Sequence, residues 1–166
     1  MTAILGLDND AIVASTGTPA FQVGSVGGRN DLTNGYQEFL YVHASEIITA
    51  AGYLCLVSSS YEAQMVDTTS SAPGVGAGLR VGAAMAAIAD NEWFWIQIYG
   101  KGSVRTLASA AVGTELTSSA TPGAVDDATT AGLEVIDGLS LGTASGGSAE
   151  TNADAYYNYP NVGRTL

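Results

Sequence analysis

The chain contains few basic residues. Its 166 residues include five Lys and Arg against sixteen Asp and Glu, which gives a formal net charge of −11 at pH 7. Nucleic-acid binding depends on Lys and Arg that displace counterions from phosphates, and a chain whose single lysine is Lys101 lacks that basic footprint. The same shortage disfavours an anionic membrane surface. We therefore expect protein surfaces, and neither nucleic acid nor membrane, as partners.

Cysteine and long apolar runs are also scarce. Cys55 is the only cysteine, so neither an internal disulfide nor a thiolate metal cluster is expected. No apolar run approaches the ~20 residues that a membrane-spanning helix needs. The first ten residues, MTAILGLDND, lack the basic start of a secretory signal. These absences predict a protein that is made in a cytoplasm and stays in solution.

The chain is also poor in charge of either sign. Charged residues make up 13% of it, about half the usual share, and the hydrophobic 46% is rich in Ala and Val. The surface must then take its polarity from Ser, Thr, Asn and Gly. Such a surface is typical of extended β proteins and of coats built from many copies, and atypical of a cytosolic enzyme. A single domain of this length buries a sizeable core without disulfides or metal.

Short β-prone segments with turn residues every 8–12 positions predict an all-β fold, a compact barrel or sandwich of short antiparallel strands. The clearest strand is 93–99 (WFWIQIY), which Gly100 is expected to close. We divide the chain into an extended N-terminal arm with short strands (1–35), a β domain (36–143), and a linker with a C-terminal tail (144–166). The tail is either a final strand packed on its own domain or a segment that binds a partner.

Glycines are concentrated in residues 72–88 (APGVGAGLRVGAAMAAI), as in a nucleotide-binding turn. A dinucleotide fingerprint needs a third glycine where this chain has Leu79, and a phosphate loop needs a Gly-Lys-Ser/Thr sequence that is missing here. We expect a turn instead, followed by a return to the sheet at Leu79, with Gly82 marking a bulge or a close approach of two backbones.

The sequence offers no pattern for catalysis or for a bound metal. His43 is the only histidine, and the G-x-S-x-G motif of a serine nucleophile occurs nowhere, so we interpret His43 as structural. Acidic pairs occur without the spacing and the glycine of a calcium loop: Asp8/Asp10, Asp90/Glu92 and Asp126/Asp127. No enzymatic activity, cofactor or metal is predicted.

Aromatic residues are the candidates for binding. Alternation along 93–99 places Phe94, Ile96 and Ile98 on the core face and both tryptophans, with Gln97, on the opposite face. That tryptophan pair predicts a subunit contact or plain core, with sugar binding as the sharper alternative. Tyrosines and an arginine in the tail are residue types that anchor interfaces. The candidate interface residues are Trp93, Trp95, Tyr156, Tyr157, Tyr159 and Arg164.

Four stretches resemble a known family: 95–100 (WIQIYG), 104–116 (VRTLASAAVGTEL), 122–126 (PGAVD) and 48–52 (ITAAG). A W-x-Q-x-x-G strand, an Ala-rich segment, a G-x-x-L step and a turn into another strand are similar to the head decoration (cement) proteins of tailed bacteriophages. The resemblance covers roughly residues 36–143.

The resemblance implies a β-rich protein on the outer capsid surface of the virion, commonly a homotrimer at three-fold positions, that clamps neighbouring subunits of the major capsid protein. It carries no catalytic residues, and it implies synthesis in the host cytoplasm. An acidic chain suits the outer surface better than the DNA-lined interior. The alternative is a carbohydrate-binding or adhesin-like β module of a phage fibre or tail.

Overall fold

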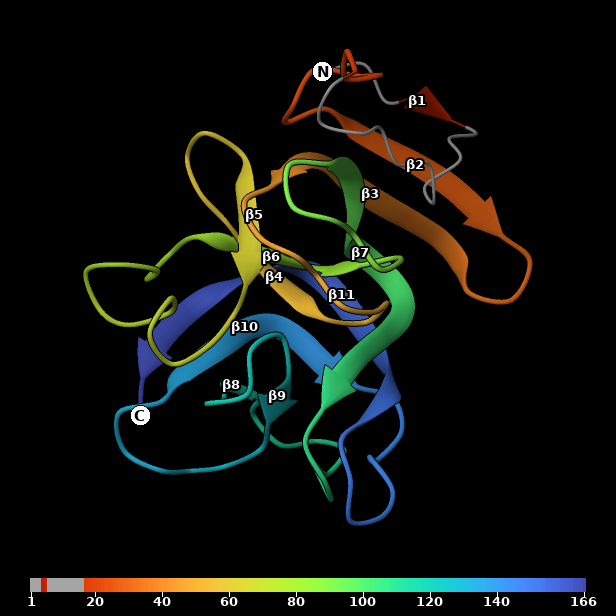
Figure 1. Cartoon of the computed structure of the whole chain (residues 1–166). Helices are drawn as coiled ribbons and strands as arrows, with labels where there is room; N and C mark the ends of the chain where they lie inside the picture. Colours follow the sequence, from red (N-terminus) through yellow and green to blue (C-terminus); the bar gives the residue numbers. More distant parts are fainter. Residues whose placement is uncertain (1–3, 6–16) are drawn as a thin grey trace.

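The computed structural model describes residues 4–5 and 17–166 and consists of strands, with no helix in those residues (Figure 1). The all-β prediction is confirmed. The strands are β1 (Ile4–Leu5), β2 (Val26–Asp31), β3 (Gly35–Ala44), β4 (Leu54–Val57), β5 (Glu62–Met65), β6 (Arg80–Ala84), β7 (Trp93–Thr106), β8 (Thr117–Ser118), β9 (Val125–Asp126), β10 (Glu134–Leu141) and β11 (Thr151–Thr165).

One sheet holds all the strands in the order β1-β2-β3-β5-β4-β6-β11-β10-β8-β9-β7, and further pairings of β7 with β3, β6 and β11 close it on itself. The pairings include two large circuits, which we call the first ring (β3, β5, β4, β6 and β7) and the second ring (β7, β11, β10, β8 and β9). Because β7 is long enough to belong to both, the sheet is not a regular barrel. β2 lies outside both rings, and the turn end of its hairpin with β3 extends away from them (Figure 1).

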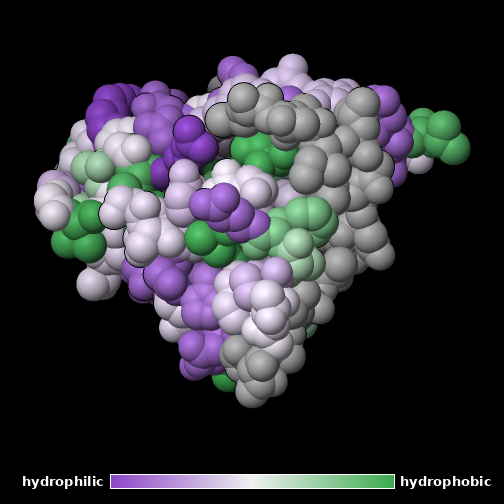
Figure 2. Space-filling model, turned by 90° about the horizontal axis from the view of Figure 1, so that it is seen from above, coloured by the Kyte–Doolittle hydropathy of each residue, from purple (hydrophilic) through white to green (hydrophobic). Residues whose placement is uncertain are grey.

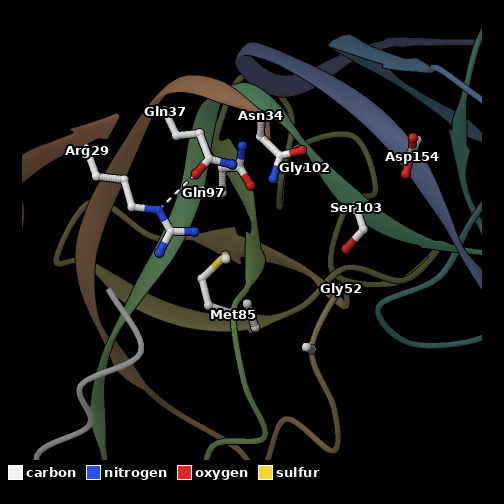
Figure 3. A pocket seen from close by; sticks show the side chains of 11 residues that line it. Arg29, Asn34, Gln37, Gly52, Met85, Gln97, Gly102, Ser103 and Asp154 are labelled. Atoms are coloured by element: carbon white, nitrogen blue, oxygen red, sulfur yellow. Dashed lines mark hydrogen bonds between the residues drawn. The ribbon is translucent and has the colours of Figure 1, made fainter. Parts of the chain in front are cut away.

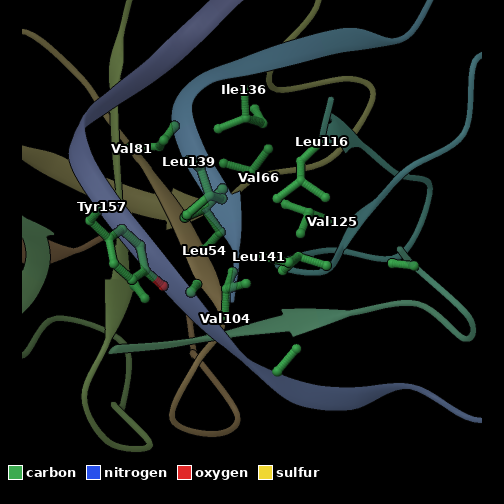
Figure 4. Packing of buried hydrophobic residues seen from close by; sticks show 14 of the residues in the cluster. Leu54, Val66, Val81, Val104, Leu116, Val125, Ile136, Leu139, Leu141 and Tyr157 are labelled. Carbon is green, nitrogen blue, oxygen red and sulfur yellow. The ribbon is translucent and has the colours of Figure 1, made fainter. Parts of the chain in front are cut away.

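Each ring has its own hydrophobic core, and alternation along β4 contributes to both. Cys55 and Val57 point into the first core, whereas Leu54 and Leu56 point into the second. The strand can be apolar throughout because both of its faces are covered. The second core also contains Leu116, and it draws most of its other members from β6, β7, β9, β10 and β11 (Figure 4).

Most neighbouring strands are antiparallel, as predicted, but three pairs are parallel: β1 with β2, β3 with β5, and β7 with β9. The expected end of a strand at Gly100 is wrong, because β7 continues to Thr106. β7 pairs with β3 as far as Tyr99 and with β11 from Tyr99 onward. Gly100 allows this exchange of partners. Its φ is +90°, and a Cβ there would overlap the carbonyl oxygen of Tyr36.

The glycine-rich stretch behaves as the sequence predicts. Gly74 and Gly78 have φ values of +80° and +77° in the turn that precedes β6. Gly82 lies where a Cβ would be 2.7 Å from the carbonyl oxygen of Gln97, which confirms the close backbone approach. The glycines therefore shape the chain at this point.

The sheet extends beyond both ends of the predicted β domain (36–143). The boundary at 35/36 falls inside the β2–β3 hairpin, and residues 151–165 form β11, the longest strand. Of the two alternatives for the tail, the structure therefore shows the final strand packed on its own chain. The Asp8/Asp10 pair and the start of the chain lie outside the described residues, except for β1.

Candidate protein-binding surface

The predicted division of strand β7 into two faces is confirmed. Phe94, Ile96 and Ile98 belong to the first core. On the opposite face, Trp95 is only 1% exposed, so of the alternatives for the tryptophan pair Trp95 is plain core. Its ring lies 4.9 Å from the ring of Tyr41 on β3 and 5.2 Å from that of Phe21, measured between centroids. Trp93 is half-buried.

The segment that contains Phe21 explains why Trp95 is covered. Gly24 donates a backbone hydrogen bond to the carbonyl of Tyr41, and the N–H of Ala20 donates to the Tyr41 hydroxyl at 3.3 Å. The indole Nε1 of Trp95 is buried and has no partner in the described chain, at a cost of about 1–3 kcal/mol. Burial of ~150–250 Å² of aromatic surface at ~25 cal/mol per Å² outweighs that cost.

The tail residues separate into buried and exposed positions. Tyr157 is buried in the second core, and its hydroxyl donates to the carbonyl of Ser103 at 2.7 Å. Its ring is therefore mainly part of the core, although Tyr157 also lines the groove described below. Tyr156 and Tyr159 are 51% and 53% exposed. Arg164 is exposed and forms an ion pair with the carboxylate of Glu115 at 2.7 Å.

Four tyrosines gather at the surface where β3, β7 and β11 meet. We call Tyr36, Tyr99, Tyr156 and Tyr159 the tyrosine surface. Tyr36, Tyr99 and Tyr156 line an open groove of about 620 Å³. Asn34 and Lys101 line it as well. The ring centroid of Tyr99 is 6.3 Å from that of Tyr36 and 5.2 Å from that of Tyr159. Tyr36 is 38% exposed.

Glu38 fixes two of these rings. Its carboxylate accepts hydrogen bonds from the hydroxyl of Tyr36 at 3.0 Å and from that of Tyr159 at 2.8 Å. The hydrogen bond to the negatively charged Glu38 raises the pKa of Tyr159 to about 12 and raises that of Tyr36. Both phenols therefore stay protonated and donate to Glu38 at neutral pH.

Sequence reasoning found Tyr156 and Tyr159 but missed Tyr36 and Tyr99. Tyr99 ends the aromatic run 93–99, and Tyr36 follows the turn at Gly35, so neither shows a local signal for a surface site. The tyrosine rings come close to one another because the strand register places both Glu38 on β3 and Asn158 on β11 opposite Tyr99 on β7.

Hydrophobic residues elsewhere are dispersed. On the face shown in Figure 2, they form small separate patches between hydrophilic ones. Within residues 17–166, the large hydrophobic residues exposed outside the tyrosine surface lie apart in the sequence: Leu32, Ile47, Val75 and Val112.

His43 has structural contacts. Its Nδ1 lies 2.8 Å from a carboxylate oxygen of Glu62 on the parallel neighbour β5, and its ring centroid is 4.8 Å from that of Trp93. In residues 4–5 and 17–166, no group of three or more His, Cys, Asp or Glu side chains has the arrangement to hold a metal ion. Burial raises the pKa of the Cys55 thiol.

Among the described residues there is no helix that is long and apolar enough to cross a membrane. In comparisons with known proteins, no family model matches the chain, and no curated protein matches it.

Proposed function

We propose that the protein is a structural decoration protein of a phage head, which binds the outer capsid surface and joins neighbouring subunits of the major capsid protein. The tyrosine surface is the observation that supports it most. Tyrosine is enriched at protein interfaces because it buries a large ring at little cost in conformational entropy and keeps a polar tip. Here the rings of Tyr36 and Tyr159 are held by contact with Tyr99 and by hydrogen bonds to Glu38, and the exposed Tyr156 lines the same groove.

Two further features support this proposal. The net charge of −11 favours the outer face of a shell, because packaged DNA repels acidic protein. The stretches at 95–100, 104–116 and 122–126 resemble those of decoration proteins. A protein that binds only the assembled shell stabilises it by mass action, in proportion to how far its concentration exceeds the dissociation constant.

Co-sedimentation with shells of the major capsid protein from the virus that encodes this chain tests the proposal. The wild-type chain is expected to pellet with the shells, and the double variant Tyr156→Ser/Tyr159→Ser is expected to bind at least tenfold more weakly. Val112→Ser, another exposed apolar residue, serves as the matched control. A wild-type chain that stays in the supernatant at saturating shell concentration would contradict the proposal.

A further inference from the structure

A second, polar pocket of about 240 Å³ lies between the β2–β3 hairpin and the middle of β7 (Figure 3). Arg29 and Asn34 line it from the hairpin, and Gln97 and Ser103 from β7. Met85 gives it an apolar wall. The pocket is smaller than the roughly 300–1,000 Å³ that drug-sized ligands occupy, so it suits a ligand of one ring or a short side chain.

Two glutamines fix the polar groups of this pocket. Gln37 and Gln97 are each 1% exposed. The Gln37 Nε2 donates to the carbonyl of Lys101 at 2.5 Å, and the Gln97 Nε2 donates to the carbonyls of Lys101 and Tyr99 at 3.0 and 3.2 Å. These bonds determine which way each amide faces. In the described chain, the Gln97 Oε1 accepts no hydrogen bond, and it lies where a Cβ at Gly102 would overlap it.

Arg29 is positioned from two sides. Its Nε donates to the Gln37 Oε1 at 2.9 Å, and its guanidinium carbon lies 5.1 Å from the centroid of the Phe39 ring. The two terminal nitrogens have no hydrogen-bond partner in the described chain and extend over the pocket (Figure 3). The pocket therefore offers fixed donors at Arg29 and a fixed acceptor at Gln97.

The charges around the pocket are balanced. Lys101 is 3.1 Å from Asp154, whose carboxylate lines the far end. The pKa of Asp31 is lowered by the N–H groups of Asn34 and Thr33, and also by the charge of Arg29. Each cation thus has a carboxylate neighbour. An anion would meet the Gln97 carbonyl oxygen and Asp154, and a cation would meet Arg29, so the pocket favours a neutral ligand.

Hydroxyl groups on adjacent carbons fit this arrangement, because each hydroxyl both accepts and donates. One hydroxyl can accept from Arg29 while its neighbour donates to the Gln97 Oε1. The C–H face of a sugar ring can contact Met85. We propose that this pocket binds a single neutral sugar unit of a glycan. This activity is independent of shell binding, and it uses residues other than the tryptophans of the sequence-based alternative.

Amide-detected NMR titration of the full-length chain with the neutral methyl glycosides of glucose, galactose and mannose, and with N-acetylglucosamine, tests the proposal. At least one sugar is expected to shift the side-chain amide signals of Gln37 and Gln97 and the backbone signal of Gly102, with saturation. Arg29→Met is expected to weaken that binding at least tenfold. Arg164→Met, which removes an arginine remote from the pocket, is the matched control.

Ser103→Leu provides a second variant in case Arg29→Met perturbs the fold, because Ser103 is exposed at the edge of the pocket and only its backbone oxygen is used in the core. It is expected to block the sugar and leave the melting temperature within a few degrees of wild type. The proposal is overturned if none of the four sugars gives saturable shifts at these residues. It is also overturned if acetate shifts them while the sugars do not, or if both variants bind like wild type.

Discussion

At the scale of the residue, Gly100 is the position on which the path of β7 most depends. Its φ of +90° strains any L side chain, and a Cβ would overlap the carbonyl of Tyr36. Gly100→Ala is expected to lower the free energy of unfolding by at least about 1–3 kcal/mol, as measured by urea denaturation. Gly146→Ala is the control, since Gly146 has open space around it. Equal free energies of unfolding for the two variants would contradict the claim that Gly100 is required where β7 exchanges β3 for β11.

The hydrogen bonds of Glu38 give a prediction about pH. The pKa of Tyr159 is about 12 in the folded chain, against 10.0 for a free tyrosine. The folded state therefore holds the proton more tightly. The raised pKa of Tyr159 contributes to the free energy of unfolding in full below pH 10, and this contribution is lost as the pH rises through about 12.

Glu38→Gln removes the negative charge and is expected to move the Tyr159 midpoint back toward 10. Carbon NMR of the tyrosine ring, followed against pH, measures this midpoint. Glu115→Gln, which alters a carboxylate elsewhere, is expected to leave it in place. A midpoint that does not respond to Glu38→Gln would show that another group holds this proton.

At the scale of the element, β11 is part of both the sheet and the second core. It pairs with β7 from Thr151 to Asn158 and with β10 over most of its length, and it contributes Tyr157 and Val162 to the core. Deletion of residues 151–166 is therefore expected to abolish cooperative thermal unfolding, as followed by near-ultraviolet circular dichroism. A truncated chain that melts cooperatively with a native-like spectrum would show that β11 is dispensable.

The sequence predicts these elements well where the signal is local. The β-branched and aromatic residues of 93–99 and their period of two place Phe94, Ile96 and Ile98 in a core, as found. The choice between a subunit contact and plain core for Trp95 could not be made from this local pattern. It depends on the register that sets Tyr41 opposite Trp95 and on Phe21, which is more than seventy positions away in the chain.

Gly100 shows the second limit of sequence reasoning. A glycine after an aromatic strand looks like an end signal, and here it is the point where one strand exchanges partners. The tyrosine surface likewise depends on strand pairing, which the sequence does not show. Tyr36, Tyr99 and Tyr159 come from three strands that are far apart in the sequence, and only the sheet order brings them together.

At the scale of the whole molecule, the resemblance to decoration proteins predicts a homotrimer. Sedimentation equilibrium at micromolar concentration is expected to give a mass near three times the 16.8 kDa of the chain. A monomer at every concentration in free solution would contradict a trimer that forms before the chain binds the shell. The proposed contact with the capsid would then be tested by the co-sedimentation experiment alone.

The most direct test of capsid decoration is a difference map from electron cryomicroscopy of shells prepared with and without the chain. Additional density is expected on the outer surface, between neighbouring major capsid subunits, and the two rings should fit into it with the tyrosine surface toward the shell. Density on the inner surface, or no additional density at saturating concentrations of the chain, would contradict it.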